Sequence, residues 1–269
     1  MVRALIIGAT GRMGQAIVRA ALERPNVRIA GAVASSDSAQ LNRDIGELAG
    51  VGRFGISVTS NLSAALADAD VVVDFSQPAA AAANLASCVG AGKPLLIGTT
   101  GLSQALEHDF ERAARHIPLL IAPNTSVGVT LLMELVRQSA RALSLEFDAE
   151  IVEAHHRMKR DAPSGTALAL GQAIADERGQ QLEQVASTNR SGEAPRKRGD
   201  IGFAVVRGGD LVGEHTVVFA GTGEQLILGH RATDRSIFAR GALDGAAWLA
   251  GKSPGRYVMR DVISLKTSS

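Results

Sequence analysis

The chain has 269 residues, 46% of them hydrophobic and 20% charged, which is typical of a globular protein with room for one large or two modest domains. Its formal net charge of +1 gives no reason to expect a nucleic acid or an anionic membrane as partner. The single cysteine, Cys88, excludes an intrachain disulfide, and its Ala-rich surroundings predict a small buried side chain. We find neither a transmembrane run nor a signal peptide and expect a cytoplasmic protein.

The first half of the chain alternates short apolar runs with helical patterns, which predicts a parallel sheet with right-handed crossovers. The runs that we expect to be strands are Arg3–Ile7, Val27–Ala34, Val71–Phe75, Pro94–Ile97 and Pro118–Ala122. The expected helices are Met13–Glu23, Asn61–Ala67 with Asn61 as N-cap, Ala79–Val89, and Ser103–Arg115 with Ser103 as N-cap.

The alternation of predicted strands and helices changes after about residue 126, where a second domain is expected to begin. We predict helices at Val129–Leu143, Ala167–Glu177 and Ser236–Ala250, and an exposed loop over 187–200. The expected extended segments are Ala149–His156, Ile201–Arg207, Glu214–Ala220, Gln225–His230 and Val258–Leu265. Glycine-rich turns between three of these segments predict a mixed or antiparallel sheet, and hence an α+β domain.

A glycine-rich turn joins the first strand to the first helix, in the sequence Gly8-Ala-Thr-Gly11-Arg-Met-Gly14. Such a turn allows close approach of the backbone to a pyrophosphate, and the following helix N-terminus offers unpaired N–H groups and a favourable dipole. Because the turn follows a strand and precedes a helix, we interpret it as a dinucleotide site in a Rossmann-type, doubly wound sheet. The predicted contacts are Gly8, Ala9, Thr10, Gly11, Arg12 and Met13.

The fingerprint also predicts an acidic residue about 20 positions further on, which would bind the ribose 2′-hydroxyl of NADH. Ala34 stands there, followed by Ser35 and Ser36. Without that carboxylate a 2′-phosphate is repelled less, so NADPH and NADH both remain candidate cofactors.

Two further loops follow predicted strands, and loops at the carboxyl ends of strands line the ligand crevice of a doubly wound sheet. Both loops are small and polar, as close approach to a nicotinamide ring requires. We therefore add their residues to the predicted cofactor site: Gly98, Thr99, Thr100, Ala122, Pro123, Asn124 and Thr125.

Proton-transfer residues are densest in one segment, which contains His155, His156 and Lys159. In an extended strand the two histidines face opposite sides, so they cannot both be core residues of one face. A histidine exchanges protons near neutral pH, and Lys159 supplies a positive charge or a proton. Adjacent histidines have poor ligand spacing and lack carboxylate or cysteine partners nearby, so we predict no metal site.

The residues Pro163-Ser164-Gly165-Thr166 open the next helix. Backbone N–H groups, two hydroxyls and the helix dipole make such a start an anion-binding site. A small dicarboxylate substrate fits this combination.

The longest motif, Glu153-Ala-His-His-Arg-Met-Lys-Arg-Asp-Ala-Pro-Ser-Gly-Thr-Ala167, resembles the signature of the 4-hydroxy-tetrahydrodipicolinate reductase (dihydrodipicolinate reductase) family. The resemblance extends over nearly the whole chain, including Gly8–Gly14, Gly98–Gly101 and Ala122–Gly128. It implies NAD(P)H-dependent reduction of 4-hydroxy-tetrahydrodipicolinate to tetrahydrodipicolinate with loss of water, in diaminopimelate and lysine biosynthesis.

The resemblance also implies roles for individual residues. His155 is then the proton donor and acceptor, Lys159 a proton donor, and His156, Ser164, Gly165 and Thr166 bind the substrate. It further implies a homotetramer, assembled through the sheet of the second domain. Residues after about 240 return to the first domain, so that 1–126 and 240–269 form the dinucleotide-binding domain and 127–239 the substrate-binding and oligomerisation domain.

Three positions depart from the family pattern. Ala34 stands where a glutamate is frequent, and Pro123 and Thr125 stand where alanine and phenylalanine are expected. Two other functions remain open on the sequence alone. The first is another nicotinamide oxidoreductase, such as an amino-acid or semialdehyde dehydrogenase, and the second is a non-catalytic dinucleotide-binding redox sensor.

Overall fold

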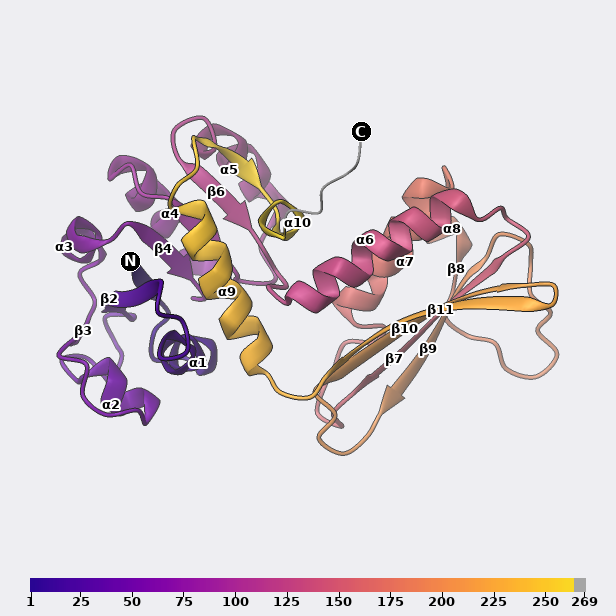
Figure 1. Cartoon of the computed structure of the whole chain (residues 1–269), viewed down its shortest axis with the longest axis horizontal. Coiled ribbons are helices and arrows are strands. Elements are labelled where there is room, and N and C mark those ends of the chain that lie inside the picture. Colours follow the sequence, from indigo (N-terminus) through magenta and orange to yellow (C-terminus); the bar gives the residue numbers. More distant parts are fainter. Residues whose placement is uncertain (264–269) are drawn as a thin grey trace. The chain divides into compact units, whose positions relative to one another are not determined.

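The computed structural model describes residues 1–263, and the chain divides into two compact units. Of the described residues, the first unit comprises 1–127 and 236–263, and the second comprises 128–235. The colours of Figure 1 show that the first unit contains both the earliest and the latest parts of the chain.

The first unit is a seven-stranded parallel sheet in the order β12-β6-β5-β4-β1-β2-β3. Its strands are β1 (Val2–Ile7), β2 (Val27–Val33), β3 (Val58–Thr59), β4 (Val71–Asp74), β5 (Leu95–Ile97), β6 (Pro118–Ile121) and β12 (Gly255–Tyr257). Every residue of β4 is buried, because helices cover both faces of a doubly wound sheet.

Helices lie on both faces of this sheet and form two apolar cores with it. One core includes α1 (Arg12–Ala21), α2 (Ile45–Ala49), α9 (Ser236–Leu249) and α10 (Met259–Val262). The other lies under α4 (Ala81–Gly90) and α5 (Glu107–Ala113), and the remaining helical turns are α3 (Leu62–Ala65), η1 (Leu66–Asp68), η2 (Pro78–Ala80) and η3 (Gln104–Leu106). Cys88 lies in this second core with no exposed surface, as predicted.

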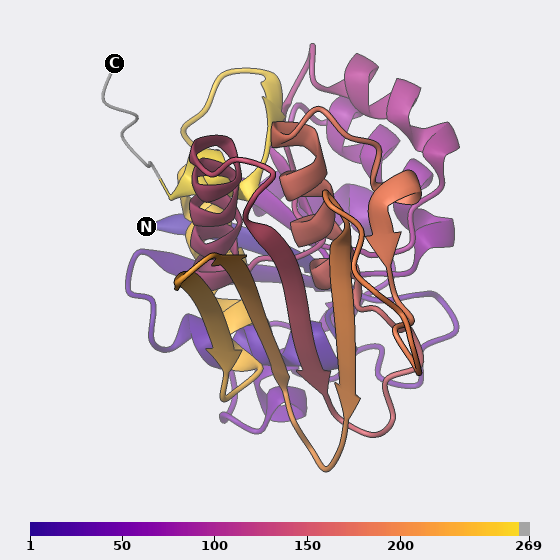
Figure 2. The same cartoon turned by 90° about the vertical axis from the view of Figure 1, so that its right-hand side faces the viewer.

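The second unit is a five-stranded mixed sheet in the order β11-β10-β7-β9-β8. Its elements are β7 (Asp148–His155), β8 (Ala186–Ser187), β9 (Ile201–Arg207), β10 (Gly213–Gly221), β11 (Glu224–Ala232), α6 (Val127–Ala142), α7 (Gly165–Glu177) and α8 (Leu182–Val185). Burial alternates along β10, as expected for a sheet with one covered face. In Figure 2 the strands lie in front of α6 and α7, which pack on the covered face.

The predicted fold class is confirmed, since a Rossmann-type parallel sheet is joined to an α+β unit with a mixed sheet. The extended segment predicted over Val258–Leu265 is wrong where the structure describes it. The chain forms the strand β12 earlier, and the backbone N–H of Val258 donates to Asp261 Oδ2 at 2.9 Å to start α10. Residues 264 and 265 of the predicted segment lie outside the described residues.

Asp44, the N-cap of α2, has a role that the sequence did not indicate. Its carboxylate accepts hydrogen bonds from five backbone N–H groups, those of Gly46, Glu47, Phe54, Gly55 and Ile56. These bonds, that from Phe54 first, lower the pKa of Asp44 to about 2. One side chain thus fixes both a helix start and the loop that follows the helix.

We expect Asp44→Asn to lower the thermal midpoint of unfolding at neutral pH, because an amide group presents donors where the five N–H groups need an acceptor. A depressed carboxyl pKa contributes stability above its unfolded value, near 3.8, which is lost as the pH falls towards 2. The difference between wild type and variant, measured by circular dichroism, should therefore shrink between pH 4 and pH 2. Asp68→Asn, at an exposed position of the same unit, is the control; equal midpoints at neutral pH would contradict the assignment.

Candidate active site

The glycine-rich turn after β1 leaves no space for side chains at two positions. Gly8 has a φ of 76°, and a Cβ there would lie 2.6 Å from the backbone oxygen of Phe75. A Cβ on Gly14 would lie 2.4 Å from the backbone oxygen of Gly8. The turn therefore folds tightly onto itself and onto the end of β4, as a phosphate-binding turn must.

The helix α1 begins at this turn without a side-chain cap. Its N-cap residue, Gly11, offers no side-chain acceptor, and its first turn contains no acidic residue. By contrast, Asp44 caps α2 and Ser164 caps α7. The first N–H groups of α1 have no acceptor within the helix and suit an anionic group of a cofactor.

Two adjoining hollows lie at the carboxyl ends of the parallel strands and share Phe75, Ser76, Thr99 and Thr100. The first, of about 550 Å³, is also lined by Gly8, Thr10, Gly11, Ala34, Ser35, Ser36, Ser60 and Gln77. The second, of about 380 Å³, is also lined by Met13, Gly98, Pro123, Asn124, Thr125 and Phe238. Two adjoining hollows of this kind suit the two halves of a dinucleotide.

Ten of the predicted cofactor residues line these hollows: Gly8, Thr10, Gly11, Met13, Gly98, Thr99, Thr100, Pro123, Asn124 and Thr125. The side chains of Ala9 and Ala122 are instead buried in the core, and Arg12 is exposed at the start of α1. The lining residues after β4, from Phe75 to Gln77, were not predicted from the sequence. The rule that indicated the loops after β5 and β6 applies equally to this loop.

Thr125 connects the loop after β6 to α9 by a hydrogen bond. Its hydroxyl donates to the backbone oxygen of Phe238 at 2.6 Å, and the residue is 2% exposed. A Cβ at Gly241 would lie 1.8 Å from the backbone oxygen of Thr125, so α9 and this loop are in close contact. The departure from the family pattern at this position therefore has a structural role within the first unit.

In the second unit, the strand β7 carries Glu153 and His155 on the covered face of the sheet, in line with the core residue Ile151. His156 directly follows the strand and is half-buried. Sequence reasoning placed the two histidines on opposite sides of a strand, whereas the strand ends between them. Either way, their side chains have different surroundings.

Glu153 is 1% exposed and binds four donors. Its Oε1 accepts from the backbone N–H of Ser164 at 2.9 Å and from Arg207 Nη2 at 2.8 Å. Its Oε2 lies 2.7 Å from Arg207 Nη1 and 2.6 Å from His155 Nδ1. Burial alone would raise the pKa of Glu153, but the bonds from Arg207, His155 and Ser164 lower it to about 2.

A second histidine, His215, faces Glu153 directly across the β7–β10 register. Its ring packs edge-to-face on His155, with centroids 5.1 Å apart, and its Nε2 lies 3.0 Å from Ser164 Oγ. Burial, followed by the charge of His155, lowers the pKa of His215 to about 4, so this ring is neutral at physiological pH. Burial also lowers the pKa of His155, although Glu153 opposes that shift.

Lys159 lies at the edge of this group, with a side chain that is 20% exposed. Its Nζ binds both carboxylate oxygens of Asp161, at 2.9 and 2.8 Å. The guanidinium of Arg207 donates to the backbone oxygen of Asp161 at 2.7 Å. The lysine and His155 are thus both connected to Arg207, a residue to which sequence reasoning gave no role.

The start of α7 combines one buried and two accessible residues. Ser164 is 1% exposed, and its hydroxyl accepts from the backbone N–H of Ala167 at 3.2 Å as the helix N-cap. Gly165 is exposed, and a Cβ at this position would meet no atom within 4 Å, while Thr166 is half-buried. The structure therefore brings His155, Lys159 and the helix start into one unit, with Ser164 on the inner side.

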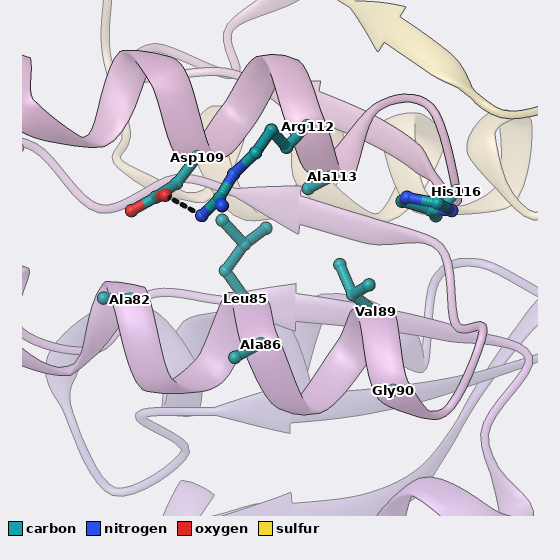
Figure 3. A pocket seen from close by; sticks show the side chains of 9 residues that line it. All are labelled: Ala82, Leu85, Ala86, Val89, Gly90, Asp109, Arg112, Ala113 and His116. Carbon is teal, nitrogen blue, oxygen red and sulfur yellow. Dashed lines mark hydrogen bonds and ion pairs between the residues drawn. The ribbon is translucent and has the colours of Figure 1, made fainter.

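A further groove, of about 480 Å³, lies between α4 and α5. Figure 3 shows Leu85 and Val89 facing Arg112 and Ala113 across it, with His116 at one end. Arg112 is paired with Asp109 at 2.5 Å. Arg112 and Asp109 neutralise each other's charge, and the walls of the groove are mostly apolar. We therefore assign the groove no part in the chemistry.

Within residues 1–263, no group of three or more histidine, cysteine or acidic side chains is placed to hold a metal ion. No helix in this part of the chain has the length and apolar character needed to span a membrane.

A Rossmann-type unit joined to a unit that concentrates proton-transfer side chains defines a two-domain, nicotinamide-dependent oxidoreductase. Family models narrow this class. Residues 2–125 match the model of the dihydrodipicolinate reductase N-terminus, and residues 128–263 match that of the C-terminus. The chain belongs to the dihydrodipicolinate reductase family.

Relatives and a solved structure agree with this assignment. The chain is 49% identical to 4-hydroxy-tetrahydrodipicolinate reductase of Alkalilimnicola ehrlichii, over 98% of this chain and 99% of that protein. It is 48% identical to the protein of the same name in Pseudoalteromonas atlantica, over 97% and 98% of the two chains. A dipicolinate-bound dihydrodipicolinate reductase from Paenisporosarcina sp. TG-14 has the same fold, with a TM-score of 0.75 and 24% identity over 96% of this chain and 97% of that one.

We expect Gly14→Ala to weaken binding of the reduced nicotinamide cofactor by more than about tenfold, because the new methyl group would clash with the backbone of the turn. Fluorescence titration with NADPH and NADH measures the dissociation constants. Gly90→Ala is the matched control, since a Cβ at Gly90 meets nothing within 4 Å. Equal cofactor affinity in the two variants would contradict our interpretation of the turn.

Proposed function

We propose that the protein catalyses the reduction of 4-hydroxy-tetrahydrodipicolinate to tetrahydrodipicolinate, with loss of water, using NADPH or NADH. The observation that carries this proposal is the cluster of His155, Lys159 and the start of α7 in one unit of a chain whose other unit has a dinucleotide-binding turn. Relatives with 48–49% identity bear the name of this reaction. Diaminopimelate and lysine biosynthesis is the corresponding pathway.

The reduced nicotinamide, when bound, supplies a hydride to carbon 4 of the substrate ring. Reduction of a conjugated imine places negative charge on the ring, and a proton must follow the hydride. His155 supplies or accepts this proton, and the ammonium group of Lys159 donates a proton or stabilises the developing charge. Loss of the hydroxyl group and a ring proton as water precedes the hydride and forms this conjugated imine, so substrate, reduced cofactor and one proton give product, oxidised cofactor and water.

The start of α7 binds a ring carboxylate in this proposal. Gly165 and Thr166 present backbone N–H groups and a hydroxyl at the positive end of the helix dipole. Ser164 contributes by capping the helix from inside, since its hydroxyl bonds Ala167 and His215. His156, half-buried beside the end of β7, orients the substrate.

The cofactor site lies in the first unit and involves Gly8–Met13, Gly98–Thr100 and Ala122–Thr125. Ala34, Ser35 and Ser36 line the first hollow at the end of β2, where an acidic residue would select NADH. Small hydroxyl side chains there leave room for a 2′-phosphate and can donate to it. This composition supports the use of NADPH as well as NADH.

We expect His155→Gln and Lys159→Ala each to lower kcat by about 10²–10⁴-fold, because each removes a proton-transfer group. Cofactor affinity should not change. Initial rates are followed by the absorbance of the reduced nicotinamide, with enzymatically generated substrate and with each cofactor in turn. His108→Gln, at an exposed position on α5, is the control, and near-normal turnover in both site variants would refute these roles.

We propose a homotetramer assembled through the uncovered face of the second sheet. Three apolar side chains lie exposed on this face, one each on β7, β9 and β11: Val152 at 39%, Val206 at 48%, which pairs with Ala154, and Ile227 at 59%. Val152 pairs with Thr216 and Ile227 with Val218, so the register places them on the face opposite the core residue Val217. Exposed apolar patches on a sheet are typical of subunit interfaces.

Ile227→Glu should reduce the tetramer to a smaller species, because it would place a charge within the apolar interface. Analytical ultracentrifugation measures the mass in solution. Leu22→Glu is the matched control, since Leu22 is an equally apolar residue, 63% exposed, on the first unit. An unchanged mass for Ile227→Glu would exclude this face as the interface.

We also propose a cytoplasmic location. The chain has no pair of cysteines, and burial raises the pKa of the Cys88 thiol to about 12, which keeps that thiol unreactive. Both properties suit a biosynthetic enzyme of a reducing compartment.

A further inference from the structure

The carboxylate of Glu153 has all of its acceptor positions occupied. A carboxylate offers about four lone-pair sites, and each oxygen of Glu153 receives two donors at 2.6–2.9 Å. With 1% exposure, the group has no access to water as a substitute partner. The carboxylate is therefore fixed in position by β9 through Arg207 and by α7 through Ser164.

This arrangement determines which nitrogen of His155 carries the proton. An ionised carboxylate only accepts hydrogen bonds, so the Nδ1 that lies 2.6 Å from Glu153 Oε2 must be the N–H. Nε2 then has a free lone pair in the neutral ring and an N–H in the charged ring. A Cβ at Gly213 on β10 would lie 3.1 Å from Nε2, so a side chain at that position would crowd this nitrogen, and glycine avoids that contact.

The charges around His155 come from each element that packs against it. Glu153 on β7 favours the charged ring, whereas Arg207 on β9 and Lys159 after β7 oppose it. His215 on β10 is neutral at physiological pH and contributes an edge-to-face contact. Glu153 is thus the one group in this set, among the described residues, that stabilises an imidazolium at position 155.

We propose that Glu153 is a positioning residue of the reaction: it holds His155 in the Nδ1–H tautomer, so that Nε2 is the atom that exchanges the proton. The same carboxylate binds the backbone N–H of Ser164, and it thereby fixes the histidine relative to the start of α7. This inference rests on the proposed role of His155. Glu153 itself does not touch the substrate.

The first test uses the wild-type protein and needs no activity. Two-dimensional NMR of ¹⁵N-histidine-labelled protein distinguishes the two neutral tautomers, and comparison with His155→Gln identifies the His155 signals. We expect the neutral ring to carry its proton on Nδ1. A neutral ring protonated on Nε2 would overturn the proposal, and this measurement remains valid even if the proposed substrate is wrong.

The second test uses Glu153→Gln. We expect kcat to fall by about 10²–10⁴-fold, with little change in cofactor affinity, because the amide no longer fixes the tautomer. The limb of the pH profile that falls as pH rises reports loss of the His155 proton. It should move to lower pH in the variant, because the negative charge that favoured the imidazolium is gone.

The matched control is Glu177→Gln, at the last residue of α7. Glu177 is also paired with arginines, Arg137 and Arg141, so its loss tests the general effect of removing a paired carboxylate from this unit. This variant should keep the tautomer and the pH profile of the wild type. If Glu177→Gln and Glu153→Gln behave alike, Glu153 is merely structural and the proposal fails.

Should Glu153→Gln not fold, Glu153→Asp serves in its place. Aspartate restores the charge but is one methylene shorter, so the pH limb should return towards that of the wild type while kcat remains reduced. A variant with wild-type kcat would show that the position of the carboxylate is unimportant and would overturn the proposal. Failure of the wild-type protein to reduce 4-hydroxy-tetrahydrodipicolinate would instead contradict the proposed function.

Discussion

The second unit depends on the satisfaction of one buried charge. A carboxylate taken out of water costs several kcal/mol unless its partners replace the lost hydration, and removal of one partner leaves the rest uncompensated. Glu153 obtains its partners from β7, β9 and α7, so these three elements must be in register before the charge is tolerated. The geometry around His155 is consequently fixed when the unit folds, so the site is preorganised before a substrate binds.

The first unit forms the turn at its ligand site without a buried charge. Its turn carries no charge and instead lacks side chains, so that the backbones of Gly8, Gly14 and the end of β4 come within contact distance. Backbone N–H groups at an uncapped helix then face the site. A site of this type suits a pyrophosphate group through its backbone alone, whereas the Glu153 cluster (Glu153, His155, Ser164, Arg207 and His215) has a defined donor for every acceptor of its carboxylate.

This contrast explains what could be predicted from the sequence. The turn and the helix start at Ser164 are local signals, and β9 has the predicted bounds, Ile201–Arg207. The partnership of Glu153 with Arg207 is not local, because 54 residues separate them and only the parallel register of β7 and β9 brings them together. Three of the five bonds to Asp44 were missed for the same reason, since their donors, Phe54, Gly55 and Ile56, lie 10–12 residues away.

The burial of His155 affects which protonation state of its ring is favoured before and after substrate binding. Burial lowers the pKa of this ring and Glu153 opposes that shift, so in the free protein the neutral form is favoured relative to an exposed histidine. A dianionic substrate beside the ring would raise the pKa again, because it brings negative charge into a site of low dielectric. Substrate binding and protonation of Nε2 then reinforce one another. In the proposed reaction the proton would thereby be taken up when a substrate is present to receive it, and a buried histidine beside an ionised carboxylate could act as an acid near neutral pH.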